Sequence, residues 1–146
     1  MMEKTNPQNE YGYLPNLIDL KNQSLQPNRK DANKDNPKIS RWINVKEKAI
    51  ISLIIEAFVD PQKKKILNHT SRGALTVPEI LKICKMPNTS GYRTINSLIK
   101  KGLLVKSSIT YPKNGRRIYK YRSIFEDVKI MIGKNKISVK IKFAKV

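Results

Sequence analysis

The most regular hydrophobic pattern in the chain covers residues 76–102 and predicts two helices joined by a short break. Thr76 and Glu79 form a capping box at the start of the first helix, in which each side chain accepts from the other residue's backbone amide. Apolar side chains then recur at helical spacing. Met86-Pro87 ends this helix, because the residue before a proline is pushed out of the α region.

The second helix covers about residues 89–101, with Asn88 or Thr89 as its cap and Gly102 as the left-handed residue that closes it. Its apolar stripe is Gly91, Ile95, Leu98 and Ile99. Its polar side chains lie elsewhere, mostly near the N-terminus: Ser90, Tyr92, Arg93, Asn96 and Ser97. A helix-turn-helix that reads DNA presents the N-terminal part of its second helix to base edges in this way.

Two strand-like runs follow, at residues 103–111 and 118–122, and Asn114-Gly115 lies between them. Asn-Gly between apolar runs is a strong hairpin signal, because both residues tolerate positive φ. Arg116 and Arg117 stand beside the turn. A helix, a break, a helix and a hairpin with a basic tip predict a winged helix domain whose wing is residues 110–117.

These features resemble archaeal winged helix-turn-helix transcriptional regulators of the group related to ArsR-type repressors. The likeness covers about residues 60–124. Its motifs are 60–67 (DPQKKKIL), 76–80 (TVPEI), 88–95 (NTSGYRTI), Leu98, 101–104 (KGLL) and 116–119 (RRIY). Gly91 departs from the pattern, because such regulators bury Val or a similar residue there. We therefore expect different packing or stability of the second helix.

Two further elements are predicted ahead of residues 76–102. Asp60-Pro61 begins a helix, with aspartate as its N-cap and proline as its first helical residue. Residues 71–75 are a loop with a short strand that pairs with the wing.

Additional elements are predicted on both sides of residues 60–124. Residues 44–59 form a long helix that is apolar almost all round, which favours burial against two surfaces, its own domain and a second subunit. Full enclosure within the monomer is the alternative. Residues 128–143 form a half-buried hairpin with strictly alternating apolar residues in its second strand. This hairpin either covers the domain or joins residues 44–59 in a homodimer contact.

The start of the chain has a different composition. Residues 1–38 are polar and predict a disordered tail, because they cannot bury enough apolar surface to offset the entropy of ordering. Residues 11–20 are an apolar island that would dock onto a partner or onto its own domain if it orders. Residues 39–146 are the predicted globular domain.

Positive charge is concentrated in that domain. The chain has a net charge of +19, of which residues 1–38 contribute +1 and residues 39–146 contribute +18. Lysine and arginine near phosphates release condensed counterions, so we expect a polyanionic partner and favour double-stranded DNA. A solvated basic surface and an anionic lipid surface are the alternatives.

Arg93 is the leading candidate for base readout, because a guanidinium pairs with guanine in bidentate fashion. Thr89 is placed to bind a phosphate at the helix N-terminus. The remaining candidates are Tyr92, Ser90 and Asn96 for base edges or backbone, and Lys113, Arg116 and Arg117 in the wing for the minor groove or backbone. The alternatives are a core position for Tyr92 and an exposed surface position for Arg93.

The sequence offers no basis for catalysis. His69 and Cys84 are the single histidine and the single cysteine, and no phosphate-cradling glycine loop or suitably spaced carboxylate pair is present. We expect no enzyme activity, cofactor, metal site or metal sensing by paired cysteines. Without an export signal, we expect a cytoplasmic, nucleoid-associated protein with no membrane partner.

We therefore expect an α+β fold: a winged helix-turn-helix domain with an extra N-terminal helix, a C-terminal β-hairpin and a disordered N-terminal tail. The expected function is a homodimeric, sequence-specific transcriptional regulator that binds double-stranded DNA. Helix 89–101 would lie in the major groove. Two alternatives stay open: a non-specific DNA-coating nucleoid protein, and a protein-interaction module of the transcription machinery.

Overall fold

A computed structural model describes residues 17–25 and 41–144 of the chain. Within these residues the fold is mixed α+β, and every strand pairing is antiparallel. The helices are α2 (Leu17–Leu25), α3 (Lys48–Val59), α4 (Pro61–Arg72), α5 (Val77–Ile83) and α6 (Asn88–Lys100). The strands are β1 (Ile43–Val45), β2 (Leu104–Thr110), β3 (Ile118–Ser123), β4 (Phe125–Ile132) and β5 (Ile137–Phe143).

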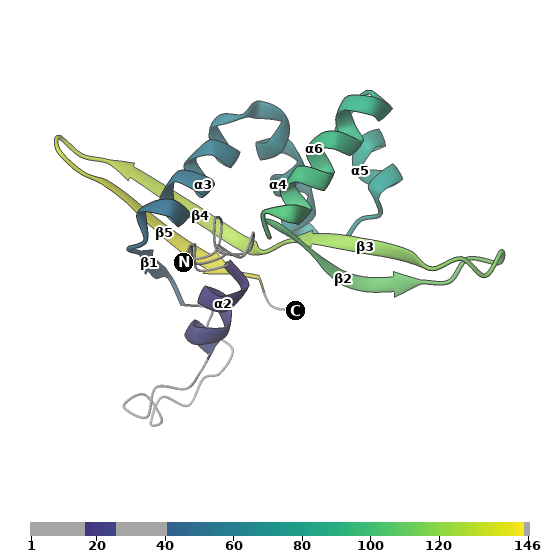
Figure 1. Cartoon of the computed structure of the whole chain (residues 1–146), viewed down its shortest axis with the longest axis horizontal. Coiled ribbons are helices and arrows are strands. Elements are labelled where there is room, and N and C mark those ends of the chain that lie inside the picture. The colour runs from purple at the N-terminus through teal and green to yellow at the C-terminus, as the bar shows by residue number, and fades with distance from the viewer. Residues whose placement is uncertain (1–16, 26–40, 145–146) are drawn as a thin grey trace, which may run out of the picture.

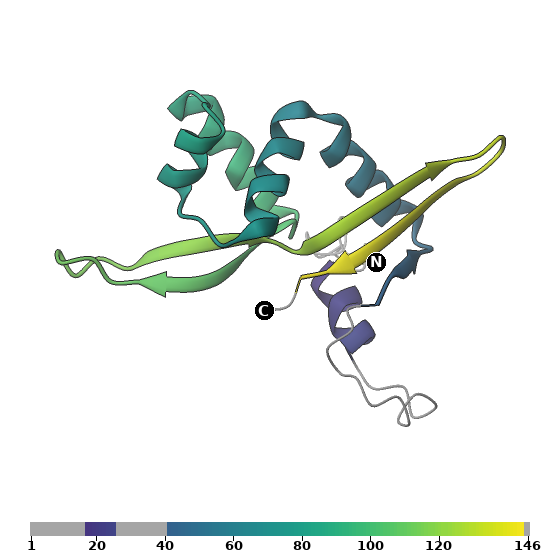
Figure 2. The same ribbon diagram turned by 180° about the vertical axis from the view of Figure 1, so that it is seen from behind.

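Two hairpins extend in opposite directions from the middle of the molecule (Figure 1). One is the two-stranded sheet β2–β3, and the other belongs to the three-stranded sheet β1–β5–β4. Only Ile124 separates β3 from β4, so these strands follow each other almost end to end. Helices α3 to α6 lie on one side of this long ribbon and α2 lies on the other, as the reverse view in Figure 2 also shows.

The hydrophobic core lies where the helices meet the ribbon. Ile54, Ile66, Ile95 and Ile124 are fully buried and come from α3, α4, α6 and the β3–β4 junction. On β5, Val139, Ile141 and Phe143 are buried at alternate positions, because successive strand residues point to opposite faces. The alternation predicted for the second strand of the 128–143 hairpin is therefore confirmed.

Several predicted helix ends are confirmed. Asp60 caps α4 by accepting from the backbone amides of Gln62 and Lys63, at 2.9 and 3.3 Å, and Pro61 is the first helical residue. Thr76 Oγ1 accepts from the Glu79 amide at 3.3 Å. The reciprocal half of the capping box differs from the prediction, because the Glu79 carboxylate accepts from the Thr76 hydroxyl at 3.1 Å.

The break between α5 and α6 is tighter than the sequence predicted. The helix ends at Ile83, before Met86-Pro87, because Lys85 adopts a left-handed conformation with φ of 53°. Met86 N donates to Leu81 O at 3.0 Å, which satisfies a carbonyl of the last turn. The predicted cap of α6 is wrong: Pro87 precedes the helix, and no side chain caps it.

The predicted helix 44–59 begins later than expected. Ile43–Val45 forms strand β1, in which Ile43 pairs with Ile141 and Val45 pairs with Val139 of β5. The helix starts only at Lys48, after Glu47. The β-branched side chains of β1 alternate toward the core, so pairing with the edge of β5 outweighs continuation of the helix.

The predicted disordered tail is wrong at residues 17–25, which form α2. Leu17 is 1% exposed and belongs to the core, and Leu20 packs against that core. The last residues of the apolar island thus dock onto their own domain. Residues 1–16 and 26–38 of the predicted tail lie outside the described residues. None of the described helices is long and apolar enough to span a membrane.

Candidate nucleic-acid interface

Close packing against α5 fixes the position of α6. Gly91, Ile95 and Leu98 form the buried face of α6. A Cβ atom built on Gly91 would overlap the Cδ2 methyl of Leu81 and lie 3.3 Å from Met86 Cβ. Glycine therefore lets the two helices approach closely, which gives a physical reason for the departure from the expected valine.

The C-terminus of α6 is also fixed by local geometry. Gly102 has φ of 77°, as the left-handed closing residue predicted from the sequence. Leu103 N donates to Leu98 O at 2.9 Å, and Gly102 N donates to Ile99 O at 3.0 Å. These two bonds end the helix and direct the chain into β2.

The outward face of α6 carries the predicted base-reading residues. At about 100° per residue, Thr89, Arg93 and Asn96 lie opposite the buried face, and all three are exposed. Ser90 and Tyr92 lie on the two flanks of this face. Ser90 is exposed and Tyr92 is 44% exposed, so Tyr92 does not occupy a core position.

The tip of the β2–β3 hairpin holds the predicted wing residues. Lys113, Arg116 and Arg117 are all exposed in the loop 111–117. Gly115 N donates to Pro112 O at 2.9 Å and Gly115 has φ of 77°. The predicted hairpin is confirmed. Asn114 does not share the positive φ of Gly115, because positive φ at both residues belongs to two-residue loops and this loop is longer.

The base of the same hairpin is anchored to the domain. Leu75 and Tyr121 exchange two backbone hydrogen bonds, of 2.9 and 2.7 Å, which confirms the predicted pairing of a short strand with the hairpin. Tyr121 packs against the core. Tyr119, in contrast, lies under the Lys106 ammonium, with 4.2 Å from Nζ to the ring centroid.

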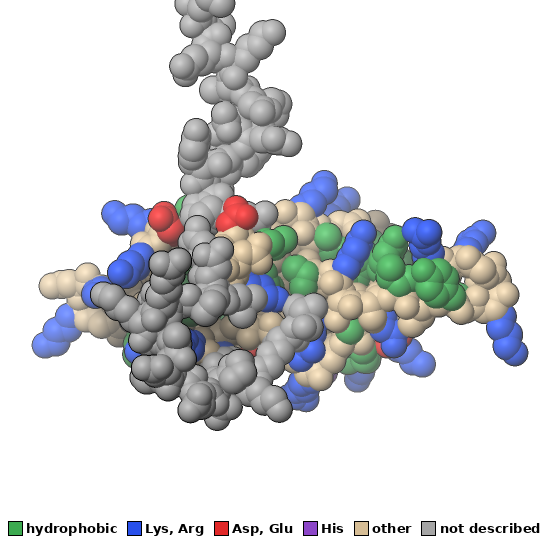
Figure 3. Space-filling view, turned by 90° about the horizontal axis from the view of Figure 1, so that it is seen from below, with side chains coloured by type: hydrophobic (Ala, Val, Ile, Leu, Met, Phe, Trp, Pro, Cys, Tyr) green, Lys and Arg blue, Asp and Glu red, His purple; other side chains and the backbone are tan. Residues whose placement is uncertain are grey.

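The charged side chains of the segment that includes α6 and the β2–β3 hairpin are all positive. Residues 80–125 contain eleven Lys or Arg and no Asp or Glu. They include α6 and the β2–β3 hairpin. Lys100, which was missed as a candidate, is exposed and extends the stripe of Thr89 and Arg93 along the helix. Figure 3 shows Lys and Arg side chains projecting from both ends of the molecule.

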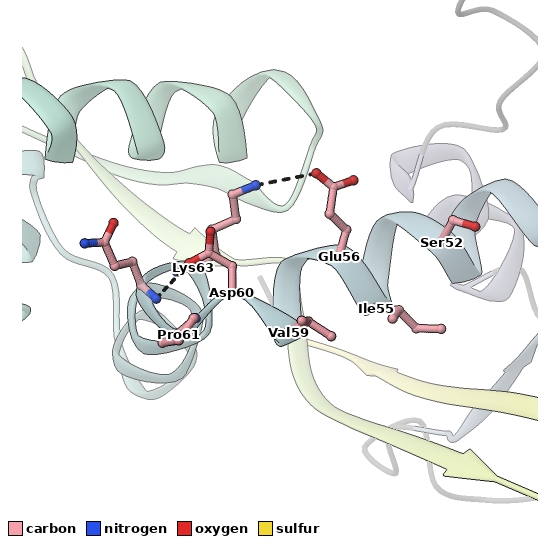
Figure 4. Close-up of a pocket in the computed structure, with 8 residues that line it drawn as sticks. Ser52, Ile55, Glu56, Val59, Asp60, Pro61 and Lys63 are labelled. Carbon is pink, nitrogen blue, oxygen red and sulfur yellow. Dashed lines mark hydrogen bonds and ion pairs between the residues drawn. The ribbon is translucent and has the colours of Figure 1, made fainter.

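Some cations near α6 are already engaged. Glu56 of α3 lies 3.3 Å from Lys101 Nζ and 3.7 Å from Lys63 Nζ. Figure 4 shows the second of these pairs above an open apolar depression where α3 meets α4. The depression is lined by Ser52, Ile55, Glu56, Val59, Asp60, Pro61, Gln62 and Lys63.

Cys84 is buried at the C-cap of α5. Burial raises the pKa of its thiol, and the nearby charge of Lys65 opposes this shift only in part. The thiol is therefore neutral and poorly suited to nucleophilic chemistry. Within residues 17–25 and 41–144, no three His, Cys, Asp or Glu side chains are grouped so that they could hold a metal ion.

The outward face of α6 and the tip of the β2–β3 hairpin both present exposed hydrogen-bond donors and positive charge. Such groups recognise phosphates and base edges. The family likeness of residues 60–124 stays a prediction. No family model, curated protein or solved structure matches the chain.

Proposed function

We propose that the chain is a sequence-specific transcriptional regulator that binds double-stranded DNA through a winged helix-turn-helix. The observation that supports this most is the outward face of α6. Thr89, Arg93 and Asn96 are exposed there, and the surrounding residues 80–125 contain no carboxylate side chain that would repel phosphate. In this proposal α6 lies in the major groove and the β2–β3 hairpin lies alongside it.

Arg93 would supply most of the base readout, because its guanidinium can donate to guanine O6 and N7 together. Thr89 and the first amides of α6 would bind a phosphate. No side chain caps this helix, so these amides are available to an anion, which the helix dipole also favours. Asn96, Ser90 and Tyr92 would add contacts from the same face and its flanks.

The β2–β3 hairpin would contribute affinity rather than sequence selection. Lys113, Arg116 and Arg117 are exposed at a tip that projects away from the helices (Figure 1). Contacts from such a tip reach the phosphate backbone or the minor groove, where sequence information is limited. Occupancy of a promoter would then repress transcription by occlusion, and activation is equally compatible with these residues.

We also propose that the protein is a homodimer, with α3 in the contact. Ile51, Ile55 and Val59 follow one another at a spacing of four residues along α3. Ile51 and Ile55 pack against the core but stay partly exposed, and Val59 is 73% exposed. Residues 47–62 carry one lysine and three acidic side chains. Two copies would therefore meet where the repulsion between basic domains is weakest.

The dimer is tested by light scattering of the full chain over a range of concentrations. Val59→Glu places like charges in the contact and should shift the mass toward the monomer. Its melting temperature at low concentration should stay close to wild type, because Val59 is exposed in the monomer. A wild-type mass that stays monomeric at all concentrations would rule out this part of the proposal.

DNA recognition is tested by selecting bound duplexes from a random pool at a stated salt concentration. A preferred site is expected. At that site Arg93→Ala should cost about 1–3 kcal/mol of binding and relax the sequence preference. Arg116→Ala should weaken binding to all duplexes alike and reduce the salt slope by about 0.9.

Each alternative predicts a different result of the same selection. A DNA-coating protein would bind all duplexes with similar affinity and yield no preferred site. A protein-interaction module would retain no duplexes above background. Unchanged site preference in Arg93→Ala would show that another surface reads the DNA.

A further inference from the structure

The outer face of the β1–β5–β4 sheet is a second surface with a net positive charge, separate from α6. It carries three lysines and Asp127, and Glu126 pairs with one of the lysines, Lys142. Apolar residues of these strands, such as Val45, Val139 and Ile141, are buried on the inner face. Alternation and register therefore place a different set of side chains outside. This outer set is Trp42, Asn44, Asp127, Lys129, Met131, Ser138, Lys140 and Lys142. Helices α3 and α6 lie on the inner side of the ribbon, so this face is turned away from α6 and shares its side of the ribbon with α2 (Figures 1 and 2).

Trp42 is held among lysines on this face. Lys129 Nζ lies 4.4 Å from the centroid of the Trp42 rings, and Lys142 Nζ lies 5.9 Å from it. The tryptophan is nevertheless 37% exposed. The part of the indole that these lysines leave exposed can stack against another aromatic ring.

The lysines on the outer face are arranged at a cost to stability. Lys129 and Lys140 are direct cross-strand partners on the same face. Like charges in this position destabilise a sheet. Lys142 Nζ lies 3.9 Å from Glu126 Oε2 and forms an ion pair with it. Neither Lys129 nor Lys140 forms an ion pair with a carboxylate of residues 41–144. An anion bound between Lys129 and Lys140 would remove this repulsion.

We propose that the outer face of the β1–β5–β4 sheet binds single-stranded nucleic acid. Phosphates contact Lys129 and Lys140, and one base stacks on Trp42. A duplex fits this face less well, because its bases are already stacked on one another and are not free to stack on Trp42. A single strand presents both a free base plane and an extended backbone. This inference does not depend on the proposed role of α6.

Trp42 is the only tryptophan of the chain, so its fluorescence reports directly on this face. The full chain is titrated with an oligothymidylate, which forms no duplex with itself. Saturable quenching of Trp42 emission is expected, with weaker quenching by a blunt duplex of equal length. In a second assay with labelled oligothymidylate, Trp42→Ala should weaken binding by about tenfold to a hundredfold.

The lysine pair gives a variant that separates binding from folding. Lys140→Glu replaces the like-charge pair by an attractive Lys129–Glu pair, so its melting temperature should equal or exceed that of wild type. Oligothymidylate binding should nevertheless be lost. The milder Lys140→Gln should lower the slope of log K against log salt by about 0.7, as for one phosphate contact on a single strand.

Arg93→Ala is the matched control, because it lies on α6 and should leave oligothymidylate binding unchanged. If α6 turned out not to bind duplex DNA, the expected oligothymidylate binding by the outer sheet face would be unchanged. The proposal is wrong if Trp42 emission does not change on addition of oligothymidylate. It is also wrong if Lys140→Glu binds like wild type, or if Arg93→Ala abolishes the quenching.

Discussion

Replacement of Gly91 by alanine tests whether close contact with α5 holds α6 in place. The added methyl group would overlap Leu81 Cδ2 and lie 3.3 Å from Met86 Cβ. Leu81 is 6% exposed and Met86 is 9% exposed, so neither side chain can turn freely into solvent. The methyl group must therefore displace Leu81 within the core or move the two helices apart.

Two effects of opposite sign decide the magnitude. Alanine is favoured over glycine inside a helix by about 1 kcal/mol. Overpacking of a well-filled core costs about 1–3 kcal/mol. Because the overlap falls on a buried side chain, we expect the upper part of that range and a net loss of about 1–2 kcal/mol in the free energy of unfolding.

The assay is urea unfolding of wild type, Gly91→Ala, Leu81→Ala and the double variant. Leu81→Ala alone should cost about 2–5 kcal/mol, because it leaves a cavity. In the double variant the new methyl group occupies space vacated by Leu81. The combined loss should therefore be smaller than the sum by about 0.5–3 kcal/mol.

Ser90→Ala is the matched control, since Ser90 is exposed and precedes Gly91 on the same helix. It should change stability by no more than about 0.5 kcal/mol. If Gly91→Ala instead raised the free energy of unfolding by about 1 kcal/mol, the full difference in helix propensity, close packing against Leu81 would be refuted. Strict additivity with Leu81→Ala would refute it as well.

Three further predictions concern residues outside the α6 surface. Lys85→Gly should stabilise the protein by about 1 kcal/mol in urea unfolding, because glycine adopts the left-handed conformation at this turn without a Cβ clash; equal or lower stability would contradict this. Leu17→Ala should cost about 2–5 kcal/mol of unfolding free energy, which a disordered N-terminal segment could not do. Folding raises the pKa of the Cys84 thiol, so the neutral thiol favours the folded state. This contribution to the free energy of unfolding is complete below the ordinary thiol pKa and is lost as the pH rises through the pKa of the folded state. Cys84→Ala should remove that part of the pH dependence, measured by urea unfolding across alkaline pH.

The parts of the fold that were predicted from the sequence are those with local causes. Asp60-Pro61, Thr76 and Gly102 each act within one or two turns of their own helix, so their effect is readable from neighbouring residues. The two hairpins likewise follow from apolar alternation around polar turns. The exposure of Arg93 follows from its position opposite the apolar stripe.

The parts that were missed depend on contacts between distant segments. Strand β1 exists because β5, from the other end of the domain, offers it an edge, and its apolar residues were indistinguishable from the first turn of a helix. Helix α2 is stabilised by the burial of Leu17 in a core formed by later residues. Alternation in the sequence already places Lys140 and Lys142 on the outer face of β5, but only the register of the sheet shows that Lys129 lies opposite Lys140.

The proposed role of α6 is tested most directly by methylation interference at guanine N7 on a selected duplex. N7 lies in the major groove and is one of the two atoms that Arg93 would contact. Wild-type protein should reject duplexes methylated at one or more guanines of the site, and Arg93→Ala should lose the strongest of these interferences. Interference that is absent in wild type, or identical in the two proteins, would contradict a reading helix at α6.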